Sequence, residues 1–509
     1  MNLIKSTGTF SFFTFLSRIL GYIRDFFIAI TLGSGPLADA FFVAFRIPNT
    51  FRRLFSEGTF NAAFIPSYSS ELTKSKKKAT SFANEVFNFL LIGLLVVVLI
   101  IEIFMPLFIK LIAPGFTANN DKLELAILLT RITFPFLFFI CLASFFSAIL
   151  NSYNKFGIAA AAPIILNIIL ICVLIFETKF GDNIVVTLSY GVSIAGLFQL
   201  ITLFIFVRKY FNPIIKISFK ITKKVKFFFK KLVPSIFSSG ITQINILVGT
   251  IIASFEASAV SYLYYADRIY QINLAIAGIA IGTVLLPKLS EYVEKKNFDR
   301  INYIQDKSLE LSLFLSLPAM FALLVAPKEI TSSLFGYGSF DVESIENSSK
   351  ALFYFAFGVP AFALIKIFST FLFARHNTKV PFYFSIFSVL LNIFIIIIFF
   401  NKIGFIIIPI STTISSWSNA ILLFLYLNNK KYFSINSKTT FSFIKILCSS
   451  SISVYLFYLF LTNFPFLFVY ENNLKLLYML IVVIFIILIY VFVSILTKAF
   501  KLSDIKLKY

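Results

Sequence analysis

The chain has 509 residues, of which 59% are hydrophobic and only 13% are charged. In a soluble globular protein about a quarter of the residues are charged, so the composition excludes a soluble enzyme and indicates a polytopic membrane protein. The formal net charge is +22. It does not indicate nucleic-acid binding, because most of the Lys and Arg residues lie in alternate loops between apolar segments. This asymmetry follows the positive-inside rule and predicts that both termini are cytoplasmic.

Apolar segments occur along the whole chain. A membrane-spanning helix needs about 20 apolar residues, and backbone groups exposed to lipid must be paired within a helix or a closed barrel. We therefore predict an all-α polytopic protein with about 14 transmembrane helices. They fall near residues 10–32, 37–65, 86–109, 125–150, 158–177, 184–207, 232–254, 261–287, 309–327, 351–374, 380–400, 404–427, 446–461 and 476–497.

The first of these segments carries Arg18, Arg24 and Asp25 at a depth where only apolar side chains are favourable. A charge inside the bilayer costs a few kcal/mol or more and generally faces protein or a water-filled cavity. Ser17 and Arg24 are seven residues apart and share one helix face. Arg18 and Asp25 lie about 10 Å apart along the axis, too far for an ion pair. We therefore expect the partners of these charges to come from other helices.

The second segment has a polar face of the same kind. Asp39, Arg46 and Arg53 recur every seven residues, Arg52 extends the face, and Glu57 follows one turn later. Pro48 is expected to kink this helix. The alternative for the arginines is a position near the cytoplasmic end, from which their side chains reach the headgroups.

The chain repeats itself weakly after about 220 residues, as in transporters built from parallel repeats. For example, Leu166-Asn167-Ile recurs as Leu391-Asn392-Ile. Six predicted spans separate equivalent points, so both halves have the same orientation. The predicted parts are an N-terminal lobe (1–225, spans 1–6), a C-terminal lobe (226–430, spans 7–12) and a final helix pair (431–509, spans 13 and 14).

In the second half, Asp267 and Arg268 open the eighth span, and Lys366 lies inside the tenth. The charges of spans one, two and eight have two more cations than anions. Unpaired buried cations are unfavourable without water or a bound anion, and the guanidinium fork suits phosphate oxygens. The cations are Arg18, Arg24, Arg46, Arg52, Arg53 and Arg268; the anions are Asp25, Asp39, Glu57 and Asp267.

Sequence motifs of catalysis are absent. The chain has no HExxH, Walker A or GxSxG pattern, and no acid/base pair is placed for hydrolysis. We therefore expect a protein that is not an enzyme, with no ATP hydrolysis, no metal site and no cofactor. Coupling to an ion gradient or to the membrane potential stays open.

Several blocks resemble the MurJ (MviN) family of lipid II flippases, within the MOP exporter superfamily. They include Leu16-Ser-Arg-Ile-Leu-Gly-Tyr-Ile-Arg-Asp25, Ala38-Asp-Ala-Phe-Phe-Val-Ala-Phe-Arg-Ile-Pro-Asn49, Arg52-Arg-Leu-Phe-Ser-Glu-Gly-Thr-Phe60 and Tyr264-Tyr-Ala-Asp-Arg268. The resemblance covers nearly the whole chain. It implies two six-helix lobes, a cationic central cavity, and a C-terminal helix pair that forms a groove for the polyprenyl tail.

The same resemblance implies which residues act. Substrate-binding positions are Ser17, Arg18, Arg24, Arg52, Arg53 and Arg268, and charge-pairing positions are Asp25, Asp39, Glu57 and Asp267. The chain departs from the family pattern at Gln271 and at His376-Asn377, where acids are common. Whether Lys366, Gln271 or His376 takes part in transport stays open.

The resulting hypothesis is a lipid II flippase of the bacterial cytoplasmic (inner) membrane that works by alternating access. Its partners would be lipid II and membrane lipids, with no nucleic acid. The alternative is another MOP-superfamily exporter, either a polysaccharide-lipid flippase or a drug/cation antiporter. A cation antiporter is expected to have a net-acidic cavity, whereas the charges counted above are net-basic.

Overall fold

The computed structural model describes residues 3–54, 60–176, 183–216, 222–274, 277–278 and 281–499, and these are helical apart from turns and short connections. The chain forms two compact units, Met1–Val260 and Ser261–Tyr509. The predicted all-α membrane architecture is confirmed. Each unit is described by itself below.

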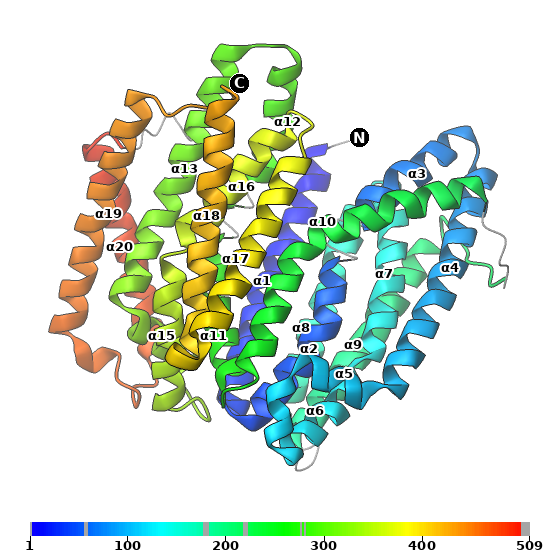
Figure 1. The fold of residues 1–509 in the computed structure, drawn as a ribbon, viewed down its shortest axis with the longest axis horizontal. Helices are drawn as coiled ribbons and strands as arrows, with labels where there is room; N and C mark the ends of the chain where they lie inside the picture. The colour runs from blue at the N-terminus through cyan, green and yellow to red at the C-terminus, as the bar shows by residue number, and fades with distance from the viewer. Residues whose placement is uncertain are drawn as a thin grey trace. The chain divides into compact units, whose positions relative to one another are not determined.

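The first unit contains ten α-helices among its described residues, and Figure 1 labels them in chain order. Helix α1 packs along α8, α7 packs against α9, and α2 packs against α6. The bounds are α1 (Leu3–Leu32), α2 (Pro36–Leu54), α3 (Phe60–Lys74), α4 (Lys76–Ile103), α5 (Met105–Ile112), the short 3₁₀ helix η2 (Pro114–Ala118), α6 (Asn120–Thr133), α7 (Pro135–Ser152), α8 (Phe156–Ile175), α9 (Ile184–Val207) and α10 (Lys223–Ala253).

Local chemistry explains where several of these helices begin. The Ser75 hydroxyl accepts from the Lys78 N–H and caps α4, and the Asn119 side chain accepts from the Lys122 N–H and caps α6. Such caps satisfy backbone donors that have no partner within the helix. Pro135 occupies the first turn of α7, where its missing N–H costs nothing.

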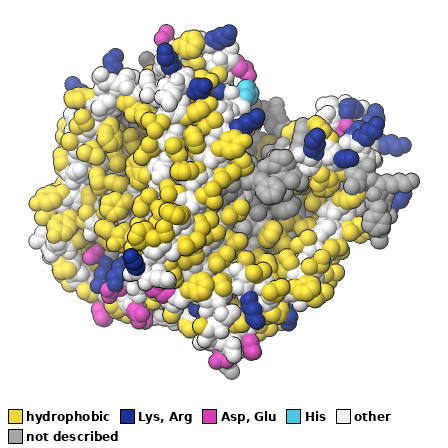
Figure 2. Space-filling view, viewed as in Figure 1, with side chains coloured by type: hydrophobic (Ala, Val, Ile, Leu, Met, Phe, Trp, Pro, Cys, Tyr) yellow, Lys and Arg dark blue, Asp and Glu magenta, His cyan; other side chains and the backbone are white. Residues whose placement is uncertain are grey.

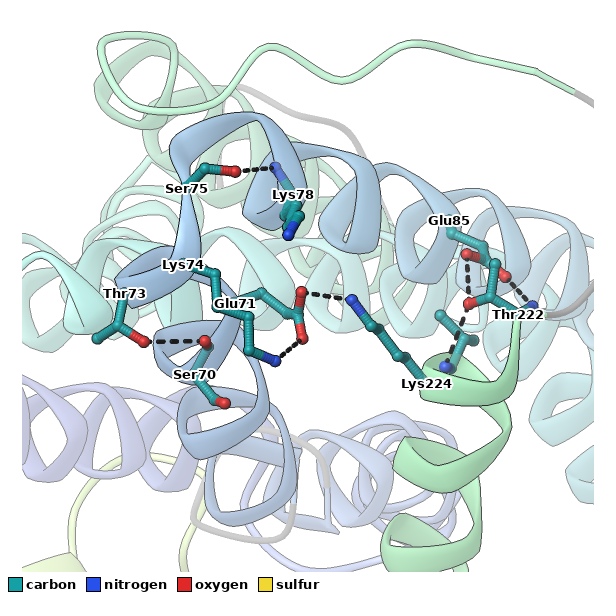
Figure 3. Close-up of polar contacts among 10 residues, drawn as sticks. Ser70, Glu71, Thr73, Lys74, Ser75, Lys78, Glu85, Thr222 and Lys224 are labelled. Atoms are coloured by element: carbon teal, nitrogen blue, oxygen red, sulfur yellow. Dashed lines mark hydrogen bonds and ion pairs between the residues drawn. The ribbon is translucent and has the colours of Figure 1, made fainter.

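Helix α10 is fastened to the first unit at its N-terminus (Figure 3). The Glu71 carboxylate of α3 accepts from Lys74 at 2.8 Å and from Lys224 of α10 at 2.6 Å. Glu85 of α4 accepts from both the N–H and the hydroxyl of Thr222, at 2.5 and 2.8 Å. These contacts hold the start of α10 against α3 and α4.

Just after these polar contacts along α10, Phe228 is fully buried. Its ring lies 5.8 Å from Phe60, 6.0 Å from Phe64 and 6.1 Å from Phe82, measured between ring centroids. The lobe boundary predicted at residue 225 therefore falls inside α10, and the structure groups the whole helix with the first unit. Helix α10 joins this unit because its buried aromatic face packs there.

The second unit has ten α-helices in the part that the structure describes. Helix α13 packs against both α16 and α19, and α17 packs along α18. The bounds are α11 (Ala259–Leu274), α12 (Ile281–Glu294), α13 (Phe298–Val325), α14 (Pro327–Phe335), α15 (Val342–Ala356), α16 (Val359–Phe373), α17 (Lys379–Ile403), η5 (Gly404–Ile406), α18 (Ile407–Asn429), α19 (Ser437–Asn463), η6 (Pro465–Leu467) and α20 (Lys475–Leu496).

The final helix pair, α19 and α20, packs within the second unit, where α19 contacts α13 and α20 contacts α14. The Tyr490 hydroxyl of α20 donates to the Phe314 carbonyl at 2.8 Å and ties the pair to α13. At the other end, the Lys475 ammonium lies over the rings of Tyr337 and Tyr470. The described helices of the predicted pair at 431–509, α19 and α20, are therefore a packed part of this unit.

Eight helices among the described residues are long and apolar enough to cross a membrane, or nine if the bent pair Val342–Ala356 and Val359–Phe373 counts as one span. The predicted number of about 14 stays a prediction. Figure 2 shows largely hydrophobic surfaces, with Lys, Arg, Asp and Glu gathered toward the ends of the helices. This distribution is the one expected of helices that present apolar sides to lipid.

Candidate functional site

Arg24 and Asp25 of α1 form a buried ion pair, with Arg24 only 6% and Asp25 only 3% exposed. The Arg24 Nε and Nη2 both donate to Asp25 Oδ1, at 3.0 and 2.6 Å. The expectation that these charges find partners only on other helices was therefore wrong. Neighbouring residues on a helix point in different directions, but the long arginine side chain folds back and reaches the carboxylate beside it.

A third nitrogen of the Arg24 guanidinium contacts a different helix. Its Nη1 donates to Asn167 Oδ1 of α8 at 3.0 Å, and the guanidinium also lies 5.5 Å from the centre of the Phe45 ring. The Asn167 amide donates in turn to the backbone carbonyl of Ser17 at 3.0 Å. Ser17 and Arg24, which the sequence placed on one face, therefore share one contact residue that the sequence had not singled out as a site residue.

Arg18 differs from Arg24. Its side chain lies on the surface of the first unit. The two arginines of α1 therefore differ in burial: Arg24 is held in the protein interior, and Arg18 is exposed.

Asp39 opens α2 and is fully buried. Its Oδ2 accepts from the Lys122 Nζ of α6 at 2.7 Å, and the same ammonium lies 4.1 Å from the centre of the Phe116 ring. Asp39 was expected to pair with arginines, and the structure adds a lysine partner. Lys122 was missed because it lies in a loop-like polar run, Asn119–Lys122, whose contact with α2 appears only after folding.

The polar face of α2 makes two further contacts. The Arg46 Nη1 donates to the Thr250 hydroxyl of α10, and the Arg52 Nε donates to Asn49 Oδ1 at 2.9 Å, one turn earlier on α2. Arg46, Arg52 and Arg53 are all partly exposed. Glu57, the last predicted member of this face, lies outside the described residues.

Pro48 stands inside α2, which continues as one helix to Leu54. A proline cannot donate to the carbonyl four residues earlier, here that of Ala44. The Thr133 hydroxyl of α6 donates to this carbonyl at 3.0 Å. A side chain on a neighbouring helix thus replaces the missing backbone bond, as membrane helices require. The predicted kink at Pro48 stays a prediction.

The second unit carries the other predicted charges on α11. The Arg268 Nη2 donates to the Tyr264 hydroxyl at 2.9 Å, and its guanidinium lies 4.8 Å from the centre of that ring. Asp267 accepts from the amide of Gln271, one turn later. At this position an amide can donate to the carboxylate, whereas a carboxylate side chain would repel it.

Two residues whose role the sequence left open also lie in this unit. Lys366 of α16 is exposed on the surface of the unit. His376 lies in the connection after α16 and is exposed, with a left-handed backbone conformation (φ 58°). No group of three or more His, Cys, Asp or Glu side chains that could hold a metal ion occurs among the described residues.

Buried Arg24, Asp25 and Asp39 lie within an all-helical, multi-pass membrane protein. A solved multidrug resistance MATE family transporter of the MOP superfamily in the inward-facing conformation has the same fold, with a TM-score of 0.67 at 15% identity over 81% of this chain and 94% of that one. The model of the Lipid II flippase MurJ family matches residues 28–478, and the chain belongs to this family.

Individual relatives agree with the family match. The probable lipid II flippase MurJ of Rickettsia prowazekii (strain Madrid E) is 38% identical over 431 residues, which cover 84% of each chain. The corresponding protein of Rhizobium meliloti (strain 1021) is 41% identical over 83% of this chain and 80% of its own length. A solved lipid II flippase MurJ in the inward closed conformation has a TM-score of 0.82 at 30% identity, covering 96% of this chain and 98% of that one.

Proposed function

We propose that this protein moves lipid II from the inner to the outer leaflet of the bacterial cytoplasmic membrane by alternating access, with both termini in the cytoplasm. The observation that carries the proposal is the family match across residues 28–478. Lipid II joins a disaccharide-pentapeptide headgroup to an undecaprenyl tail through a diphosphate. The diphosphate is the anion that a set of intramembrane arginines can recognise.

In this proposal Arg24 and Arg268 contact the diphosphate, and Ser17, Arg18, Arg52 and Arg53 complete the binding surface. Asp25 occupies two donors of Arg24 while no substrate is bound. Diphosphate binding then exchanges one set of charge-assisted hydrogen bonds for another, so Arg24 is never left buried without an anion. Asp39, Glu57 and Asp267 are the other charge-pairing carboxylates of the proposal, and Asp39 has Lys122 as a partner.

Transport moves the headgroup and breaks no covalent bond, so neither an acid/base pair nor ATP is part of the proposal. The lobes rock to open the site to one side at a time. The polyprenyl tail stays in the membrane and lies against α19 and α20.

The test is complementation of a bacterial strain depleted of its own lipid II flippase, with surface labelling of lipid II as the readout. The intact chain should restore growth and outward-facing lipid II. Arg24→Ala should restore neither, although immunoblotting shows normal insertion. Unchanged surface labelling with and without the intact chain would refute the proposed function.

A further inference from the structure

Asn167 of α8 contacts two residues of α1, Ser17 and Arg24, that lie about two helical turns apart. Its amide nitrogen donates to the Ser17 carbonyl, and its amide oxygen accepts from Arg24 Nη1, each at 3.0 Å. Ser17 and Arg24 lie about 10 Å apart along α1. The amide passes over Gly21, where an added Cβ would lie 3.8 Å from its nitrogen and 3.9 Å from its oxygen. Gly21 therefore leaves the surface of α1 open for this side chain.

The orientation of this amide is determined by its partners. A guanidinium only donates and a backbone carbonyl only accepts, so the oxygen of Asn167 must face Arg24 and the nitrogen must face Ser17. Asn167 is 5% exposed in the middle of α8. An asparagine is costly in a membrane helix unless both of its polar groups are paired, and here α1 supplies both partners.

Asn167 acts on Arg24 differently from Asp25. Asp25 neutralises the guanidinium and moves with it, because the two residues are neighbours on α1. Asn167 is uncharged and belongs to α8, so it orients the guanidinium without removing its positive charge. A carboxylate at position 167 would add a second anion beside Arg24 and compete with a phosphate ligand.

We infer that Asn167 is a positioning residue for Arg24: it holds one guanidinium nitrogen while the donors facing Asp25 are exchanged for the diphosphate. This inference rests on the proposed function. Without the amide oxygen, Arg24 keeps its charge and its bond to Asp25 but loses its fixed orientation. The cost should appear in substrate affinity more than in the maximal transport rate.

The test is a double-mutant cycle on the full chain in proteoliposomes, with lipid II transport measured at several lipid II concentrations. Asn167→Leu removes both polar atoms at similar volume and should raise half-saturation about ten-fold, the size expected for one hydrogen bond to a charged group. Asn167→Gln keeps both polar groups and should recover most of the affinity. In an Arg24→Lys background, Asn167→Leu should change half-saturation less than about two-fold, because a lysine has no second nitrogen to orient.

The matched control is Asn88→Leu. Asn88 is a 7% exposed asparagine of α4 whose amide joins backbone groups of Asn84, Ile214 and Lys216. Its substitution should lower the melting temperature with no coupling to Arg24. If Asn167→Leu is not recovered from membranes, Asn167→Ala, which also removes both polar atoms, takes its place in the cycle and should likewise raise half-saturation only when Arg24 is present.

Unchanged half-saturation in the Asn167 variant, or equal effects in both Arg24 backgrounds, would overturn the inference while the proposed function stands. Full transport by Arg24→Ala would instead refute the role of Arg24 itself. Failure of the intact chain to transport lipid II would refute the proposed function. The cycle therefore distinguishes failure of the positioning role of Asn167 from failure of the proposed function.

Discussion

The Lys122 ammonium of α6 donates to the Asp39 carboxylate of α2 at 2.7 Å, and the two side chains are only 10% and 0% exposed. Removing one partner of a buried pair leaves an uncompensated charge, at a cost of about 3–5 kcal/mol. Lys122→Met should therefore strongly lower the melting temperature of the protein in detergent. Adding Asp39→Asn should restore most of the loss, because both charges of the pair are then removed.

Lys350→Met is the control for that experiment. Lys350 and Glu346 also pair at 2.8 Å, but both side chains are 54% exposed. Exposed pairs contribute about 1 kcal/mol or less, so the melting temperature should hardly change. Equal losses in the Lys122 and Lys350 variants would contradict the buried character of the Asp39 pair.

Glu71→Gln should weaken the attachment of α10 in a pH-dependent way. Hydrogen bonds from Lys224 and Lys74 lower the pKa of Glu71 from its ordinary value. The stabilisation is therefore fully present above the unfolded pKa of about 4.3 and is lost as the pH falls through the lower folded pKa. Both lysines are half exposed, so the effect at pH 7 should be about 1 kcal/mol or less.

Melting curves from pH 7 down to pH 3 test this. The difference between the intact chain and Glu71→Gln should shrink at the acidic end, because the intact carboxyl is then protonated as well. A difference that stays constant over this range would exclude an ionised Glu71 as the source of the attachment.

Phe228→Ala should loosen α10 much more than Phe227→Ala. Phe228 is fully buried among aromatic side chains, whereas Phe227 beside it is 56% exposed. Truncating a buried phenylalanine costs about 3–5 kcal/mol, and an exposed one changes stability by only about 0.5 kcal/mol. The measurement is the melting temperature, together with limited proteolysis of the segment before α10. Similar behaviour of both variants would mean that α10 does not pack as described.

Arg268→Ala should abolish complementation, whereas Tyr264→Phe should reduce transport by about ten-fold or less. The phenylalanine keeps an aromatic ring beside the guanidinium and removes only the hydroxyl that accepts from Arg268. Initial transport rates in proteoliposomes, corrected for the amount of inserted protein, compare the two variants. Full growth on Arg268→Ala would remove this residue from the proposed site.

The helical architecture and several interior charges could be predicted from the sequence because the bilayer restricts which residues can lie within it. Apolar length and helix periodicity depend only on neighbours in the chain, and they predicted the all-helical membrane architecture. The cost of a charge in lipid pointed to Arg18, Arg24, Asp25 and Asp39 as interior residues; the last three are buried, whereas Arg18 is exposed. The blocks around them also carried the resemblance that the family match confirms.

The pairing of these charges follows from the folded arrangement of the helices. Arg24 takes Asp25 from its own helix and Asn167 from α8, and Asp39 takes Lys122 from α6. These choices depend on which helices become neighbours and on where long, flexible side chains reach, and neither is encoded in residue spacing. Residue spacing and the cost of a buried charge were enough to predict that charged side chains of the first two helices would lie in the protein interior, whereas packing between helices fixes which residue contacts each charge and in what orientation.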